Sequence, residues 1–194
     1  MPRIAKDPDE LRVAVMEACI KTFNEKGLKL TVEDVAKLCH VSKKTLYLMY
    51  ADKEAMLIAA IDYCFASIKE CEKEVYDDPN LSTIEKLKKI MVGMPEKLQG
   101  VDFTRSYEFK EAYPSLHKRA NMHLESDWEP TIELLKKGMD EGVIRKDINI
   151  YVVKAIIEST IENFLTHPTF KKVGISYNQA LADLIDIVMN GIAV

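Results

Sequence analysis

The chain has 194 residues and a formal net charge of −4, with 47% hydrophobic and 30% charged residues. This balance is ordinary for a folded protein and excludes an intrinsically disordered chain. No stretch approaches the ~18 apolar residues of a membrane-spanning helix, and the polar start "MPRIAKDPDE" lacks the apolar core of a signal peptide. We therefore expect a cytoplasmic protein with no membrane association.

Helical spacing dominates the first quarter of the chain. Apolar residues recur at helical intervals over 9–26, and Gly27 is a natural stop. Thr31, with Asp34 three residues later, has the pattern of a capping box that begins a second helix. Ser42 and Asp52 are good N-caps for a short third helix and a long fourth one. The turn sequence "DDPN" at 77–80 ends the fourth helix.

The rest of the chain is also predicted to be helical. Ser82 opens a helix that Gly93 and Pro95 interrupt, and a short helical piece follows over 103–112. Pro114 fits the first turn of a long helix that reaches about Glu141 and is kinked at Pro130. The last two helices are expected at 148–166 and 176–191. No alternating strand pattern occurs, so the predicted fold class is all-α.

The four cysteines lack CxxC spacing, and we interpret them as small buried hydrophobes or free thiols. Adjacent Cys39 and His40, without a second ligand pair nearby, make a poor zinc site. We expect no metal and no cofactor.

The stretch "LCHVSKKTLYLMY" contains the residues that point most clearly to a function. On a helix that begins after Ser42, one face presents Lys43, Lys44 and Tyr47, while the other contains Leu46, Met49 and Tyr50. Two lysines at a helix N-terminus are unfavourable beside the helix dipole unless an anion is bound there. Lys53, directly after the Asp52 cap, and Thr31, at the start of the second helix, offer further groups for a phosphate.

The spacing of the second and third helices fits a helix-turn-helix, whose second helix enters the DNA major groove. The net charge of residues 1–55 is close to zero, with ten Lys and Arg against nine Asp and Glu. Any DNA contact must therefore come from local placement of cations rather than from bulk charge.

Residues 31–57, "TVEDVAKLCHVSKKTLYLMYADKEAML", resemble the DNA-binding signature of TetR-type transcriptional regulators. The positions that carry the resemblance are Thr31, Ala36, Val41, Ser42, Leu46, Tyr47, Tyr50, Lys53, Glu54 and Leu57. The resemblance implies a helix-turn-helix DNA-binding domain at 1–52 and a helical ligand-binding and dimerisation domain at 53–194. It implies that Lys43, Lys44 and Thr45 lie near the groove, beside Ser42, with Thr31, Tyr47 and Lys53 on the phosphate side.

The sequence departs from the family pattern at two positions. His40 stands in the turn where the family often has glycine, at a position that is commonly left-handed. Met49 stands where many members have a polar residue on the DNA side, which removes one expected phosphate contact.

Apolar and aromatic side chains are concentrated where the family binds a small molecule. Flexible methionines and aromatic rings suit an adaptable apolar site, although for any single residue a place in the core is the simpler interpretation. The candidate ligand-binding residues are Met91, Met94, Phe103, Tyr107, Tyr113, His117 and Trp128.

The predicted helices at 148–166 and 176–191 are apolar around much of their circumference, which requires two packing partners. One is the chain's own core, and the other is expected to be a second copy, giving a homodimer through these helices. We therefore expect a ligand-responsive repressor on a near-palindromic operator of double-stranded DNA, released by a small apolar or amphipathic effector.

Two other functions remain open from the sequence. The first is a small helical enzyme that uses His117 and His123 with Glu108, Glu111 and Glu125, but no nucleophile or metal-site signature supports catalytic residues there. The second is an interaction module that keeps the helix-turn-helix and no longer binds DNA. Replacing Lys43, Lys44 and Tyr47 separates this module from a DNA-binding regulator.

Overall fold

The computed structural model describes residues 7–167 and 172–194. The described residues form helices and no β-strand; an isolated antiparallel bridge joins Ile144 to Ala193. The all-α prediction is therefore confirmed for this part of the chain. No described helix combines the length and apolarity needed to cross a bilayer.

The first four helices fall where the sequence predicted them. Their bounds are α1 (Pro8–Lys26), α2 (Val32–Cys39), α3 (Lys43–Met49) and α4 (Lys53–Asp77), with a 3₁₀ turn η1 (Gly27–Lys29) between α1 and α2. The following elements are α5 (Thr83–Val92), η2 (Glu96–Leu98), η3 (Phe103–Ser106), α6 (Tyr107–Ala112), α7 (Pro114–Glu125), α8 (Glu129–Asp140), α9 (Ile150–Thr166) and α11 (Tyr177–Ile192).

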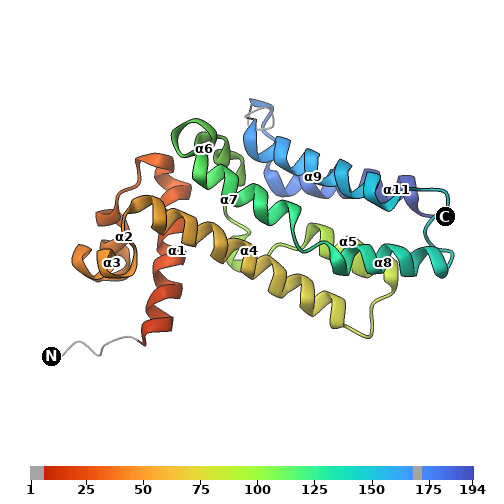
Figure 1. The fold of residues 1–194 in the computed structure, drawn as a ribbon, viewed down its shortest axis with the longest axis horizontal. Helices are drawn as coiled ribbons and strands as arrows, with labels where there is room; N and C mark the ends of the chain where they lie inside the picture. Colours follow the sequence, from red (N-terminus) through yellow and green to blue (C-terminus); the bar gives the residue numbers. More distant parts are fainter. Residues whose placement is uncertain (1–6, 168–171) are drawn as a thin grey trace.

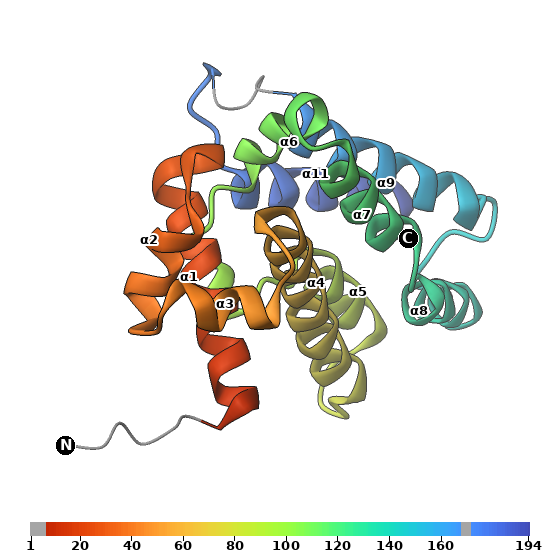
Figure 2. The same ribbon diagram turned by 60° about the vertical axis from the view of Figure 1, so that its left-hand side comes forward.

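The molecule is elongated, with α1, α2 and α3 at one end (Figure 1). Helix α4 begins beside this group and runs obliquely toward the far end, where α5 and α8 lie. Helices α9 and α11 lie side by side along the opposite edge, and α6 and α7 stand between them and α4. Figure 2, with the first end turned forward, shows α1, α2 and α3 grouped to one side of α4.

Local capping explains where the first helices begin. Thr31 and Asp34 form a reciprocal capping box: the Asp34 amide donates to the Thr31 hydroxyl, and the Asp34 carboxylate accepts from the Thr31 amide. Ser42 and Asp52 accept from the amides of Thr45 and Ala55. These interactions fix the first residues of α2, α3 and α4, as the sequence predicted.

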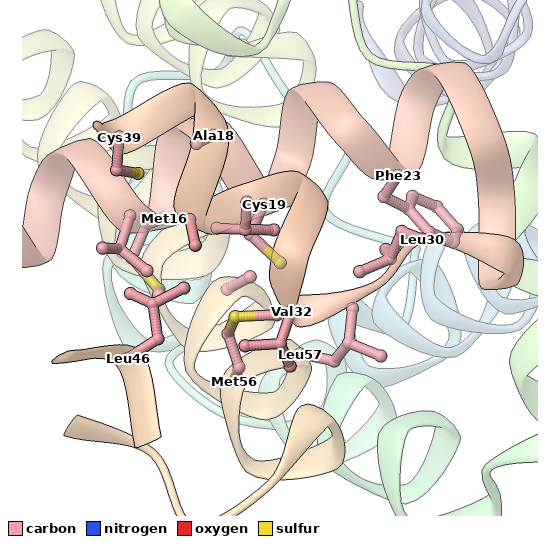
Figure 3. Close-up of a cluster of buried hydrophobic side chains, with 14 of the residues drawn as sticks. Met16, Ala18, Cys19, Phe23, Leu30, Val32, Cys39, Leu46, Met56 and Leu57 are labelled. Atoms are coloured by element: carbon pink, nitrogen blue, oxygen red, sulfur yellow. The ribbon is translucent and has the colours of Figure 1, made fainter. Parts of the chain in front are cut away.

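A first hydrophobic cluster holds α1, α2, α3 and the start of α4 together. Leu46 lies in it among Met16, Cys19 and Met56, side chains from α1 and α4 (Figure 3). Phe109 of α6 and Leu116 of α7 belong to the same cluster. The N-terminal core thus extends beyond residue 52, and the division into 1–52 and 53–194 stays a prediction.

A second cluster occupies the other end. It contains buried side chains from α5, α8, α9 and α11, with Ile144 of the turn before α9, and the end of α4 packs against it through Val75 and Tyr76. Helix α4 therefore contacts both clusters.

The single kinked helix predicted from Pro114 to about Glu141 was wrong, because the chain forms two helices there. Asp127 has φ 60°, a left-handed conformation that no α-helix accommodates. The Trp128 indole donates to the Leu124 carbonyl at 2.8 Å and helps to close the end of α7. Pro130 lies in the first turn of α8, where its missing N–H costs nothing.

Helix α3 offers a matched test of this packing. Leu46 is 1% exposed and Leu48 is 79% exposed, two residues apart on one helix. We predict that Leu46→Ala lowers the free energy of unfolding by about 2–5 kcal/mol, whereas Leu48→Ala changes it by less than about 0.5 kcal/mol. Urea unfolding followed by circular dichroism measures both. Equal losses for the two variants would contradict the orientation of α3.

Candidate nucleic-acid interface and ligand cavity

Helix α3 presents a polar surface on the side away from the core. Lys43, Lys44, Tyr47 and Leu48 are exposed on it, while Leu46 is buried. The two faces are those that the helical spacing predicted. Tyr50 packs against the first cluster, as predicted. Leu48 was not among the candidate residues, although its position four residues after Lys44 places it on the same face.

The two lysines of this surface have different partners. Glu33 of α2 accepts from Lys43 at 2.9 Å and from Lys37 at 3.0 Å. The hydrogen bond from Lys43, followed by that from Lys37, lowers the pKa of Glu33, and the same contact raises the pKa of Lys43. Lys44 makes no ion pair among the described residues. Its charge is therefore fully available to an external anion.

Thr31 and Lys53, both predicted phosphate contacts, are engaged within the protein. The Thr31 hydroxyl donates to Asp34 at 2.8 Å, and hydrogen bonds, first from Lys26, lower the pKa of Asp34 to about 2. The Lys53 ammonium donates to the Leu28 carbonyl at 2.7 Å and lies 5.5 Å from the centre of the Tyr113 ring. Lys53 thus ties the start of α4 to the turn between α1 and α2.

The two departures from the family pattern have local explanations. His40 has φ 57° and ψ 36°, the left-handed conformation expected at the turn, and is exposed. Its amide caps α2 through the carbonyls of Ala36 and Lys37. Met49 packs against the first cluster, so it lies with the packed face of α3. No group of three metal-ligating side chains occurs among the described residues.

Two adjoining apolar cavities lie beside α4, each of about 110 Å³. Five residues line both: Phe65, Ile68, Met94, Leu124 and Tyr177. The first cavity extends toward α1 and η3 and is lined almost wholly by apolar side chains. The second extends toward α8 and has a more polar wall that includes Lys69, Glu72, His123 and Asp127. Together they offer an apolar compartment with one polar end.

Tyr177 stands at the junction of the cavities. Its ring lies 5.2 Å from that of Phe103 and 6.4 Å from that of Phe164. Burial raises the pKa of its phenol well above the ordinary value. Its hydroxyl makes no hydrogen bond with the described residues, so a bound molecule would find a polar group there.

The model of bacterial regulatory proteins of the tetR family matches residues 15–60, which span most of α1, all of α2 and α3, and the start of α4. Residues 15–60 thus form a DNA-binding segment of the TetR type. The protein is a DNA-binding protein with a helix-turn-helix and a helical C-terminal part, as the resemblance of residues 31–57 implied.

Regulators that are similar to this chain over most of its length support the same assignment. It is 22% identical over 179 residues to the uncharacterized HTH-type transcriptional regulator YvaF of Bacillus subtilis, covering 92% of this chain and 93% of that one. It is 22% identical over 195 residues to the HTH-type transcriptional repressor NicS of Pseudomonas putida, with 95% and 91% covered. Among solved structures, FadR from Bacillus subtilis in complex with stearoyl-CoA superposes with a TM-score of 0.65 at 18% identity, over 92% of this chain and 98% of that one.

The structure brings four of the seven candidate ligand residues of this regulator to the cavities. Phe103 lines the first, Met91 and Trp128 line the second, and Met94 lines both. Tyr113 packs against the first cluster, and His117 lines neither cavity. The side chain of Tyr107 lies outside the described residues. The ligand roles of all seven stay predictions.

Sequence reasoning missed the wall that α1 and α4 provide. Cys19, Leu57, Cys64 and Phe65 line the first cavity, and burial raises the pKa of both thiols to about 12. The apolar spacing along α4 is visible in the sequence. This spacing was the signal that would have found the wall.

A polar cluster beside the second cavity was also missed. Asp62 of α4 accepts from Arg119 at 2.5 and 3.0 Å and contacts His123 Nε2 at 2.7 Å. The His123 ring stacks on Phe65 at 4.6 Å. Burial opposes ionisation of Asp62, but the bonds from Arg119 and then His123 lower its pKa overall. The cluster fastens α7 to α4.

No hydrogen bond or ion pair joins His117 or His123 to Glu108, Glu111 or Glu125 in the described part of the chain. Glu108 is instead bonded to Arg105 and Leu28. The histidines and glutamates considered for an enzyme are thus not assembled into one site, and the relatives are regulators.

The availability of Lys44 leads to a test with DNA. We predict that Lys44→Ala weakens binding to DNA and lowers the slope of log affinity against log salt by about one, because one phosphate contact is lost. Lys88→Ala, which removes an exposed lysine on α5, should leave both unchanged. Fluorescence anisotropy with a labelled operator at several salt concentrations provides the measurement. Equal slopes for the two variants would contradict a phosphate contact from Lys44.

Proposed function

We propose that this protein is a homodimeric repressor that binds a near-palindromic operator and leaves it when a small apolar or amphipathic ligand fills the cavities beside α4. The observation that carries this proposal is the double role of α4. Its first turns pack in the cluster that positions α3, and its middle turns line both cavities.

The DNA surface of the proposal is the exposed side of α3 with its flanking turns. Lys43 and Lys44 supply positive charge, Tyr47 a phenol, and Ser42 and Thr45 hydroxyls. In a major groove, lysine recognises guanine acceptors, and an apolar side chain such as Leu48 contacts a thymine methyl. Thr31 and Glu33 flank the surface from α2. Lys53 is assigned a positioning role, because its ammonium already binds the Leu28 carbonyl.

The dimer surface of the proposal is the outer face of α9 and α11. Ile156 is 48% exposed and Ile187 is 70% exposed, and Val152 and Tyr151 are also exposed on α9. Large apolar side chains exposed on two neighbouring helices favour burial against an identical face, which gives a two-fold axis. Two α3 helices related by that axis would require an operator of matching symmetry.

The ligand of the proposal is an amphiphile of modest size. The apolar first cavity suits a hydrocarbon or aromatic body, and Tyr177 with the polar wall of the second cavity suits a polar group. At about 110 Å³ each, the cavities are small for a drug-sized ligand, so binding would require α4 and its neighbours to move apart. The stearoyl-CoA bound to FadR and the repressor function of NicS support this proposal by analogy.

Ligand and operator then oppose each other. If the ligand favours an expanded arrangement around α4 and the operator favours the compact one, each weakens the other's binding by the same factor. Repression relieved by ligand follows from this linkage.

The dimer is tested by placing a charge on its proposed surface. Ile187→Asp should convert the dimer to a monomer and reduce operator affinity, because the buried carboxylates would repel each other and lose hydration. Ala182→Asp, at an exposed position on a different side of α11, should remain dimeric. Light scattering after size exclusion gives the mass, and footprinting gives the symmetry. A dimeric Ile187→Asp variant with an unchanged footprint would contradict the assigned surface.

The ligand class is tested by release from DNA. Octanoate, decanoate, hexadecanoate and stearoyl-CoA are titrated into the operator complex, and an amphiphile that fits should raise the operator dissociation constant by about 5–150-fold. Ile68→Ala enlarges the junction of the two cavities, so it should shift the preference toward the longer chains. Native mass spectrometry of the protein as purified identifies any retained molecule. An empty protein that no amphiphile releases from DNA would refute the proposal.

A further inference from the structure

The turn between α1 and α2 is hydrogen-bonded to the segment at 100–108, which lies far from it in the sequence. The Asn24 side chain donates to the Gly100 carbonyl at 3.0 Å and accepts from the Asp102 amide at 2.7 Å. Arg105 Nη1 donates to the Asn24 carbonyl at 2.7 Å. We call the turn at residues 24–28 the corner, and Asn24, Arg105 and Glu108 the corner clamp.

Leu28 joins this corner to two different helices. Its amide donates to Glu108 Oε2 of α6 at 3.2 Å, while its carbonyl accepts from Lys53 of α4 at 2.7 Å. The two polar groups of one residue thus bind α6 and α4. A relative movement of those helices must stretch one bond or displace the corner.

The sequence of the corner allows an unusually close approach. Gly27 has φ 59° and ψ −144°, a conformation that side chains other than glycine rarely adopt. A Cβ atom there would overlap the Arg105 guanidinium and the Glu108 carboxylate. Arg105 also donates to Glu108 at 3.2 Å, with side-chain exposures of 19% and 22%. Charged groups this sheltered are less screened than those of surface ion pairs.

The segment that carries the clamp also lines the first cavity. Val101, Phe103, Ser106 and Phe109 contribute to the cavity wall, on both sides of Arg105. The Phe109 ring packs against that of Phe23 of α1 in a tilted arrangement, with the ring centres 5.1 Å apart. The Arg105 guanidinium lies 5.8 Å from the centre of the Phe23 ring. A ligand or side chain that enlarges the cavity must therefore displace the segment at 101–109, which also holds the corner.

We infer that the corner clamp, and Arg105 in particular, transmits the state of the cavity to α2 and α3. The inference rests on the proposed function of the cavity as the ligand site. Arg105 and Asn24 are positioning residues, since they lie away from the exposed face of α3. When η3 and α6 move outward, Arg105 and Glu108 draw Asn24 and Leu28 with them. Helix α2 begins four residues after Leu28, and the recognition helix α3 follows it.

The test replaces the unidentified ligand by a side chain. Ala120 and Cys64 line the first cavity, and Ala120→Leu or Cys64→Leu fills it from within. Each filling variant is made alone, with Arg105→Ala, with Arg105→Lys, and with Tyr76→Phe. The last is a matched control, because it removes a 2.9 Å bond from Tyr76 to Glu133 that joins α4 to α8 at the far end. Circular dichroism confirms folding, and the operator dissociation constant is measured for every protein.

Filling the cavity should raise the operator dissociation constant about tenfold with the clamp intact and with Tyr76→Phe. With Arg105→Ala the same filling should raise it less than about twofold, because the push no longer reaches the corner. Arg105→Lys keeps a cationic donor for the Asn24 carbonyl and should restore much of the effect. Hydrogen exchange of the Leu28 amide should become faster when the cavity is filled, but only when the clamp is intact. A general loss of stability would speed exchange elsewhere as well, so this local change distinguishes the two.

Two results would overturn the inference and are distinguishable. An equal tenfold effect with and without Arg105 would show that the cavity acts on DNA binding by another route, which leaves the proposed function standing. If both filling variants fold and neither changes operator affinity, the cavity does not control DNA binding. The proposed function and the clamp then fail together.

Discussion

The structure depends on the continuity of α4. Its 25 residues carry apolar side chains that are needed in three places: Met56 and Leu57 in the first cluster, Cys64 and Ile68 at the cavities, and Val75 beside the second cluster. The helix is uninterrupted from Lys53 to Asp77, so one rigid element joins these three places. In the proposed function, a displacement imposed at the cavity is transmitted along α4 to the DNA-binding end.

Electrostatics complements this mechanical constraint. Charged side chains at the junctions between elements are paired within the protein: Lys53 with the corner, Arg105 with Glu108 and Arg119 with Asp62. On α3, Lys44 makes no ion pair with any residue that the structure describes. Most of the positive charge at these junctions is thus used within the protein, and we propose that Lys44 is available to a DNA phosphate. This division suits a protein of net negative charge that must bind DNA at selected sites rather than indiscriminately.

Local signals made much of the fold predictable. Thr31, Ser42 and Asp52 are caps whose chemistry lies within three residues, so the sequence alone placed α2, α3 and α4 correctly. The break at Asp127 was missed because a left-handed residue before Pro130 is stabilised by the Trp128–Leu124 bond, which no periodicity reveals. The cavity was only half predicted. Met94 and Phe103 were found by residue type, whereas Cys19 and Cys64 line it because helices distant in sequence cross there. The internal partner of Lys53 was missed for the same reason, because Leu28 lies 25 residues away.

The central claim is that the state of the cavity sets the position of the DNA-binding helices. A distance between the two copies of the proposed dimer measures this directly. A nitroxide on Glu25→Cys, exposed at the end of α1, with Cys71→Ser removing a partly exposed thiol, allows pulsed electron resonance between protomers. Binding of operator DNA should narrow the distribution of nitroxide–nitroxide distances. The Ala120→Leu substitution should shift the mean distance away from the operator-bound value. Identical distributions for the filled and unfilled proteins would contradict the account.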